Sequence, residues 1–114
     1  MMANLWEETI EFLKENDKTF EDVLFIQGED FKVTKENFEI VAKKTDYDDS
    51  FGAQHVATDL VLVGDDWWIE RAEYDGSEWW EYKSIPTEKD KVEHIYHLGN
   101  GMWDTIKDLN KDKL

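Results

Sequence analysis

Cysteine is absent from this chain of 114 residues, and several kinds of site are excluded with it. Disulfide frameworks, thiolate zinc sites, iron–sulfur clusters and cysteine nucleophiles all require that side chain. Proline occurs once, as Pro86, and no proline-rich linker or internal repeat divides the sequence. We therefore expect a single domain over residues 1–114, which is long enough to bury one core without covalent staples.

Long apolar runs are absent as well. No run approaches the roughly 18 residues that span a bilayer. The sequence also does not begin with a basic stretch followed by an apolar one, as a secretory leader would. We expect a cytoplasmic protein without a membrane partner.

Positive charge is scarce. The chain has 28 acidic and 13 basic residues, for a formal net charge of −15, and Arg71 is its only arginine. Direct binding of nucleic acid requires a cationic surface that releases counterions, so this balance argues against it. It is typical of a solvated acidic coat, and two sharper interpretations stand beside that one. They are a cationic protein partner and mimicry of the phosphate pattern of DNA.

Aromatic residues, in contrast, make up 14% of the chain and supply ample material for a core. Asn4 is a good N-cap for a helix over residues 5–15. Thr34 is equally suited to begin a second helix, which would run through Lys44. The residues expected on the inner side of that helix are Phe38, Val41 and Ala42.

Runs of β-branched and aromatic residues separated by turn residues predict strands. Asp75-Gly76, between two aromatic-rich runs, is a strong local signal for a hairpin. The expected strands are residues 23–27, 56–63, 67–74 and 78–84, with a loop over residues 45–55. The run Leu60 to Val63 predicts burial of its strand on both faces. The fold class is therefore α+β, with a three- to four-stranded antiparallel meander, an N-terminal helix and further flanking helices.

The pattern beyond Pro86 is ambiguous. Residues 87–98 are compatible with a helix that begins at Thr87 and equally with a strand of alternating apolar residues. Trp103, Ile106 and Leu109 predict a short final helix.

Two tryptophan doublets, Trp67-Trp68 and Trp79-Trp80, lie on consecutive predicted strands. Side chains alternate between the faces of a sheet, so each doublet places one indole on each face. One face would pack against helices. The other is either covered, for example by the C-terminal segment, or exposed as an aromatic patch within a rim of acidic residues, which is the composition of a protein-binding hot spot.

The candidate partner-binding residues lie on this double-tryptophan hairpin. They are Trp67, Trp68, Glu70, Arg71, Glu73, Glu78, Trp79, Trp80 and Glu81. If the turn consists of Asp75-Gly76 alone, Arg71 lies opposite Trp80 and can stack on its ring. We interpret that arginine as structural.

Three patterns that suggest metal chemistry are incomplete. His94 and His97 have the spacing of two ligands on a helix but lack a third. Residues 46–57 lack the glycine and glutamate positions of a calcium loop. Asp66 with Glu81-Tyr82-Lys83 has the order of a metal-dependent nuclease site, a remote interpretation that the net charge disfavours. We therefore predict no metal, no cofactor and no enzymatic activity.

The stretch from Asp46 to Glu81, with Phe51-Gly52-Ala53-Gln54, Gly64-Asp65-Asp66-Trp67-Trp68 and Glu73 to Trp80, resembles small uncharacterised proteins of phages and prophages of Gram-positive bacteria. The resemblance implies a phage accessory context and transfers no site residue. Our leading hypothesis is a non-enzymatic module that binds a protein partner or a second copy of itself through the hairpin. The alternative is a DNA mimic that inhibits a host nucleic-acid enzyme.

Overall fold

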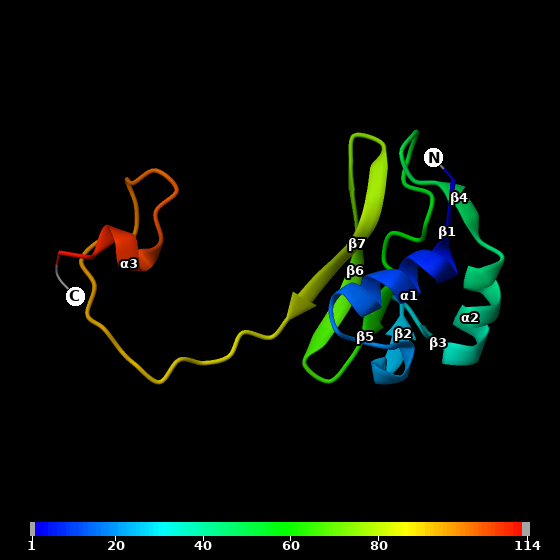
Figure 1. The fold of residues 1–114 in the computed structure, drawn as a ribbon, viewed down its shortest axis with the longest axis horizontal. Coiled ribbons are helices and arrows are strands. Elements are labelled where there is room, and N and C mark those ends of the chain that lie inside the picture. The colour runs from blue at the N-terminus through cyan, green and yellow to red at the C-terminus, as the bar shows by residue number, and fades with distance from the viewer. Residues whose placement is uncertain (1, 113–114) are drawn as a thin grey trace.

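The structure, a computed structural model, describes residues 2–112 (Figure 1). Residues 2–84, hereafter the body, hold all strands and two α-helices, and residues 85–112 form a C-terminal arm that extends away from them. None of the helices in residues 2–112 has the length and hydrophobicity required to cross a bilayer.

Both helices of the body begin at the predicted caps. In α1 (Leu5–Glu15), the side chain of Asn4 accepts a hydrogen bond from the backbone N–H of Glu7 at 3.1 Å. In α2 (Lys35–Lys43), the hydroxyl of Thr34 accepts one from the N–H of Asn37 at 3.0 Å. Each bond satisfies one of the backbone donors that the first turn of a helix leaves without a partner.

One predicted contact of α2 is wrong. Phe38 and Ala42 are buried as expected, but Val41 is exposed. Because α2 lies at one end of the body and packs along a narrow stripe, only residues four apart reach the core. A 3₁₀ turn, η1 (Phe20–Asp22), lies between the two helices. The ring of Phe20 packs edge-on against Trp6 of α1, with ring centroids 4.9 Å apart, and stacks on Phe38 of α2 at 6.0 Å.

The main sheet is antiparallel and has five strands in the order β3-β2-β5-β6-β7. Its strands are β2 (Phe25–Gln27), β3 (Lys32–Val33), β5 (Val61–Val63), β6 (Trp67–Tyr74) and β7 (Ser77–Ser84). The predicted meander is therefore confirmed, and β2 and β3 extend it by a second hairpin. A separate two-stranded sheet pairs β1 (Met2–Asn4) with β4 (Asp46–Asp48), which corrects the expectation of an unbroken loop over residues 45–55.

Strand β5 is much shorter than predicted. Residues 56–60 do not pair with a neighbouring strand. The backbone N–H groups of His55 and Val56 are hydrogen-bonded to the carboxylate of Glu78, and residues 57–60 form a turn in which the N–H of Leu60 donates to the carbonyl of Ala57 at 3.4 Å. Burial on both faces is also wrong. Leu62 is fully buried, whereas Val61 and Val63 are only half-buried on the other side of the sheet.

The core lies between the sheet and α1. Ile26, Leu62 and Ile69 occupy directly opposed positions on three neighbouring strands and are fully buried. Leu5 and Leu13 of α1 are buried with them. This side of the sheet is hereafter the covered face.

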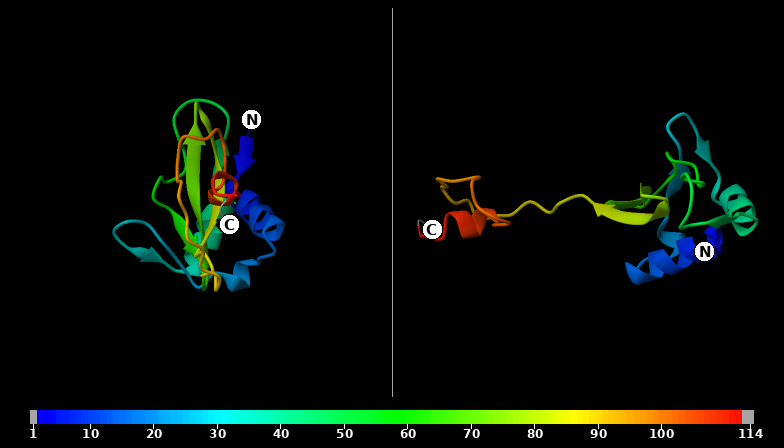
Figure 2. Two further views of the ribbon diagram at one scale, coloured as in Figure 1. Left: turned by 90° about the vertical axis from the view of Figure 1, so that its left-hand side faces the viewer. Right: turned by 90° about the horizontal axis from the view of Figure 1, so that it is seen from above.

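The opposite side, hereafter the open face, is not covered by any helix of residues 2–112. Figure 2 shows α1 on one side of the β6–β7 hairpin and no helix on the other. An antiparallel sheet with one face solvated is stable, because the covered face alone can supply a core. The C-terminal segment therefore does not cover the second tryptophan pair.

The arm contains neither the helix nor the strand that the sequence allowed for residues 87–98. Short amphipathic segments need a surface to pack on, and these residues lie away from the body. The predicted final helix is present as α3 (Ile106–Leu109), but Trp103 lies outside it.

Candidate protein-binding face

The strand register sets the composition of the open face. A two-residue turn at Asp75-Gly76 places Tyr74 opposite Ser77, and every second residue from there points to the same side. The residues of the open face are Phe25 and Gln27 of β2, Lys32 of β3, Val61 and Val63 of β5, Trp68, Glu70, Ala72 and Tyr74 of β6, and Ser77, Trp79, Glu81 and Lys83 of β7.

Several aromatic side chains of the open face are exposed to solvent. Trp79 is 38% exposed, Phe25 37% and Tyr74 76%, and Trp68 is half-buried. Large aromatic side chains in small domains are mostly core residues, so their exposure on one face of a sheet is informative. They form an aromatic surface on a rigid support.

Acidic residues accompany these rings. The indole Nε1 of Trp68 donates a hydrogen bond to the carboxylate of Glu70 at 2.7 Å, which holds that ring against the sheet. Glu81 lies opposite Glu70, and Lys83 makes a loose ion pair with Glu81 at 3.6 Å. The open face therefore combines aromatic rings with a carboxylate pair at its centre.

The other tryptophan of each doublet lies in the core, as alternation requires. Trp67 and Trp80 are each 2% exposed. The indole Nε1 of Trp80 donates to the hydroxyl of Thr9 on α1 at 3.0 Å, and that hydroxyl donates to the carbonyl of Leu5 at 2.6 Å. Trp67 stacks on the ring of Tyr82, with centroids 5.9 Å apart. The hydrogen bond from Trp80 to Thr9 joins α1 to the covered face.

Arg71 is the centre of a buried ionic network on the covered face. Its guanidinium donates to Glu78 at 2.9 Å, to Glu8 of α1 at 3.1 Å and to the hydroxyl of Tyr47 at 3.0 Å. It also lies 4.7 Å from the ring of Trp80, so the predicted cation–π contact is confirmed. The network joins α1, β4, β6 and β7.

The network shifts the pKa of two of its members, Tyr47 and Arg71. Burial raises the pKa of Tyr47 far above its usual value, and the hydrogen bond to Glu8 adds to this. Burial by itself would lower the pKa of Arg71, but the hydrogen bond to Glu78 and the charge of Glu8 raise it. Both shifts favour the protonated form of the side chain.

The structure divides the nine residues proposed from the sequence. Trp68, Glu70, Trp79 and Glu81 lie on the open face, and Glu73 is exposed near the hairpin turn. The other four do not reach a partner from the folded body because they are buried on the covered face; they are Trp67, Arg71, Glu78 and Trp80. Phe25, Val61, Val63 and Tyr74 are further apolar residues of the open face that the sequence did not single out, and the same alternation that sorts the tryptophans identifies them once the register is known.

The residues with metal-like spacing are not assembled into a site. Among residues 2–112, no group of three or more histidine or acidic side chains is placed to hold a metal ion. Asp66 precedes β6 and its carbonyl accepts from the N–H of Ile85, whereas Glu81 lies opposite Glu70, four residues further along the strand. His94 packs edge-on against Tyr96 at 5.0 Å between ring centroids.

Comparison with known proteins adds no assignment to this geometry: no family model matches the chain, and neither a curated protein nor a solved structure shows significant similarity to it.

Proposed function

We propose that this chain is a non-enzymatic protein-binding module whose binding surface is the open face of the sheet. The observation that carries the proposal is the exposure of Trp79, Phe25 and Tyr74 on a sheet that is otherwise anchored to its core by Trp67 and Trp80. Tryptophan and tyrosine are the residue types that dominate binding energy in protein interfaces.

The scaffold is suited to binding because it is rigid where the rings project. The hairpin is held from behind by the Arg71 network and by the Trp80–Thr9 hydrogen bond. A preorganised surface loses little conformational entropy on association, so more of the contact energy appears as affinity.

The negative charge of the body favours a partner of positive charge. Glu70 and Glu81 lie among the aromatic residues, and Glu73 and Asp75 are exposed at the turn. Residues 1–84 hold 22 of the 28 acidic residues but only eight of the 13 basic ones. A surface of this sign attracts a partner that presents apolar groups flanked by lysine or arginine.

The test compares capture by three immobilised full-length chains: wild type, Trp79→Ser and Ile40→Ser. Ile40 is an exposed apolar residue on the outer side of α2, so its variant controls for loss of an apolar side chain elsewhere. A bacterial lysate, the source that the resemblance to phage proteins suggests, is the first prey. We expect capture by wild type and by Ile40→Ser and loss of capture by Trp79→Ser, with the melting temperatures of all three within a few degrees. Capture that is indifferent to Trp79 would overturn the proposal.

Inhibition of a nucleic-acid enzyme by DNA mimicry is supported by net charge alone. The same experiment examines it, because duplex DNA and salt should displace such an enzyme from the wild-type chain. Complexes that resist both would leave the aromatic surface as the binding determinant.

A further inference from the structure

The end of the arm, residues 95–112 and hereafter the knob, is organised around one side chain. Asn110 is 1% exposed. Its Oδ1 accepts from the N–H groups of Tyr96 and His97 at 2.7 and 2.9 Å, and its Nδ2 donates to the carbonyls of His97 and Ile106 at 2.9 and 2.8 Å. These four hydrogen bonds hold residues 96–97 against the end of α3.

The knob is too small to be stable in water alone. It contains one helix of four residues and has no cysteine to staple it. Isolated helices shorter than about 12 residues are marginal, and units below about 40 residues need staples, metals or a partner surface. Many apolar side chains of the arm are exposed instead of buried; they are Val92, Tyr96, Leu98, Met102, Trp103 and Ile106. A surface must cover them for the knob to persist.

Trp103 is the most prominent of these side chains. It is 94% exposed, and its φ of 59° lies in the left-handed region that bulky residues rarely adopt. In the loop around Trp103, the N–H of Met102 donates a hydrogen bond to the carboxylate of Asp104 at 3.2 Å. Asn100 in the same loop also has a positive φ. Strained backbone that displays a fully exposed indole is a feature of binding loops.

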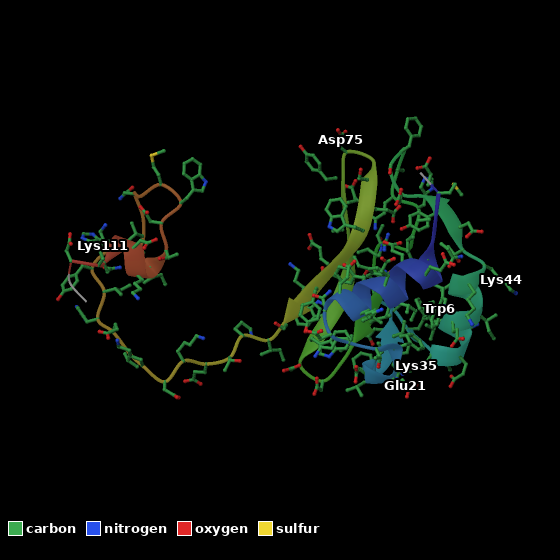
Figure 3. The ribbon with its side chains drawn as sticks, in the orientation of Figure 1. Trp6, Glu21, Lys35, Lys44, Asp75 and Lys111 are labelled. Carbon is green, nitrogen blue, oxygen red and sulfur yellow. The ribbon has the colours of Figure 1, made fainter. Side chains whose placement is uncertain are left out.

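The arm is directed away from its own sheet. The N–H of Ile85 donates to the carbonyl of Asp66 at 2.9 Å, so the arm leaves in line with β7. Pro86 keeps the residue before it extended. Figures 1 and 2 show the knob far from the body, and Figure 3 shows Lys111 on the knob well separated from Asp75 at the hairpin tip.

The arm is almost neutral, whereas the body is strongly acidic. Residues 85–114 hold six acidic and five basic residues, against 22 and eight in residues 1–84. Four lysines, Lys89, Lys91, Lys107 and Lys111, line a hollow of the arm together with Glu93, Ile95 and Ile106, and Glu93 forms an ion pair with Lys91 at 2.9 Å. The arm thus presents exposed apolar side chains together with lysines, and the open face is aromatic with Glu70 and Glu81 at its centre.

We infer that the open face binds the C-terminal arm of a second copy of this chain, with Trp103 seated on the exposed rings around Trp79 and the arm lysines facing Glu70 and Glu81. This inference rests on the proposed function of the open face and names its partner. Fully extended, residues 85–94 span up to about 33 Å, which lets the knob reach a neighbouring molecule. A two-fold exchange makes both contacts identical and closes the assembly as a dimer.

The test is sedimentation velocity of the full-length chain over concentrations from about 1 to 100 µM, the range in which moderate affinities are resolved. The variants are Trp103→Ser, Trp79→Ser and the control Ile40→Ser. We expect wild type and the control to form dimers, and each tryptophan variant to dimerise at least ~30-fold more weakly, since truncation of a central interface residue typically has such an effect. Trp103 is almost wholly exposed, so its replacement leaves the body folded.

A mixture of the two variants separates exchange from other assemblies. The Trp103→Ser chain keeps its open face and the Trp79→Ser chain keeps its arm, so a heterodimer retains one intact contact that neither homodimer has. We expect the mixture to form dimers at concentrations at which each variant alone is monomeric.

Three outcomes would overturn the inference. They are a monomeric wild type, a dimer that Trp103→Ser does not weaken, and a mixture that associates no better than its components. A monomeric wild type that still captures another protein through Trp79 would leave the proposed function in place and remove only this inference.

Discussion

The guanidinium of Arg71 lies over the indole of Trp80, with its Cζ 4.7 Å from the ring centroid, and the two residues are directly opposed on β6 and β7. Both terminal nitrogens of Arg71 are used by Glu78, Glu8 and Tyr47, while its Nε is buried without a hydrogen-bond partner among the described residues. The side chain is therefore committed to the fold, and the open face is left as the binding surface.

Replacement of Arg71 tests this network. In Arg71→Met, the carboxylate of Glu78 stays buried without its counter-charge, and we expect the free energy of unfolding to fall by about 3–5 kcal/mol, as when other buried pairs lose one partner. Lys83→Met removes an exposed cation from β7 and should change it by less than about 0.5 kcal/mol. Urea unfolding measures both, and the double variant Arg71→Met/Glu78→Gln should recover part of the loss. Equal effects of the two single variants would contradict the buried role of Arg71.

The two tryptophans of the second doublet should respond differently to truncation. Trp80→Ala removes a buried indole and the hydrogen bond to Thr9, and we expect a loss of about 3–5 kcal/mol. Trp79→Ala removes a side chain that is partly in water and should cost about 1 kcal/mol or less. Both are measured by urea unfolding at concentrations at which the chain is monomeric, since association adds apparent stability. A loss at Trp79 as large as that at Trp80 would show that the open face is covered in the folded chain.

Gly64 and Gly99 form a matched pair. A Cβ at Gly64 would lie 2.1 Å from the indole of Trp67, which is buried and cannot move aside, so we expect Gly64→Ala to cost about 1–3 kcal/mol through overpacking. A Cβ at Gly99 meets no atom within 4 Å, and Gly99→Ala should stay within about 0.5 kcal/mol of wild type. Thermal unfolding compares them. If Gly64→Ala is as stable as Gly99→Ala, Trp67 is not packed against the turn.

Tyr47 makes stability fall at alkaline pH. The folded state holds the phenolic proton above the usual pKa of 10.0, so the stabilisation is complete below about pH 10 and is lost as the pH rises further and the unfolded chain ionises. Tyr47→Phe lacks the hydrogen bonds to Glu8 and Arg71 and should be less stable at pH 7 by about 1–2 kcal/mol. Urea unfolding between pH 7 and about 11 should show the gap between the two proteins narrowing above pH 10. A constant gap would mean that Tyr47 ionises equally in both states.

Much of the fold could be predicted from interactions between residues that are close in sequence. Asn4 and Thr34 cap the two helices as predicted, and Asp75-Gly76 forms the turn that places Arg71 opposite Trp80. Each of these depends on residues close in sequence, whose geometry is set by backbone dihedrals and by the two-residue period of a strand. The same period requires that one indole of each doublet lies on each face.

Contacts between distant residues escaped prediction. Strand β5 begins five residues later than the apolar pattern indicated. The carboxylate of Glu78 accepts from the N–H groups of His55 and Val56, and a turn over residues 57–60 follows before the sheet begins. The pairing of β1 with β4 likewise joins segments more than 40 residues apart. A side chain remote in sequence leaves no periodic signal where it binds.

The sequence by itself determined that the two faces of the hairpin each carry a tryptophan pair, and that one arginine lies against one of them. Only the tertiary structure decided which pair is buried. Thr9 and Glu8 on α1 bind Trp80 and Arg71, so the helix docks on that face and the opposite face, with Trp68 and Trp79, stays open. The alternation of a strand is a local property of the backbone, whereas the choice of covered face is the sum of contacts made only when the helix and the sheet meet.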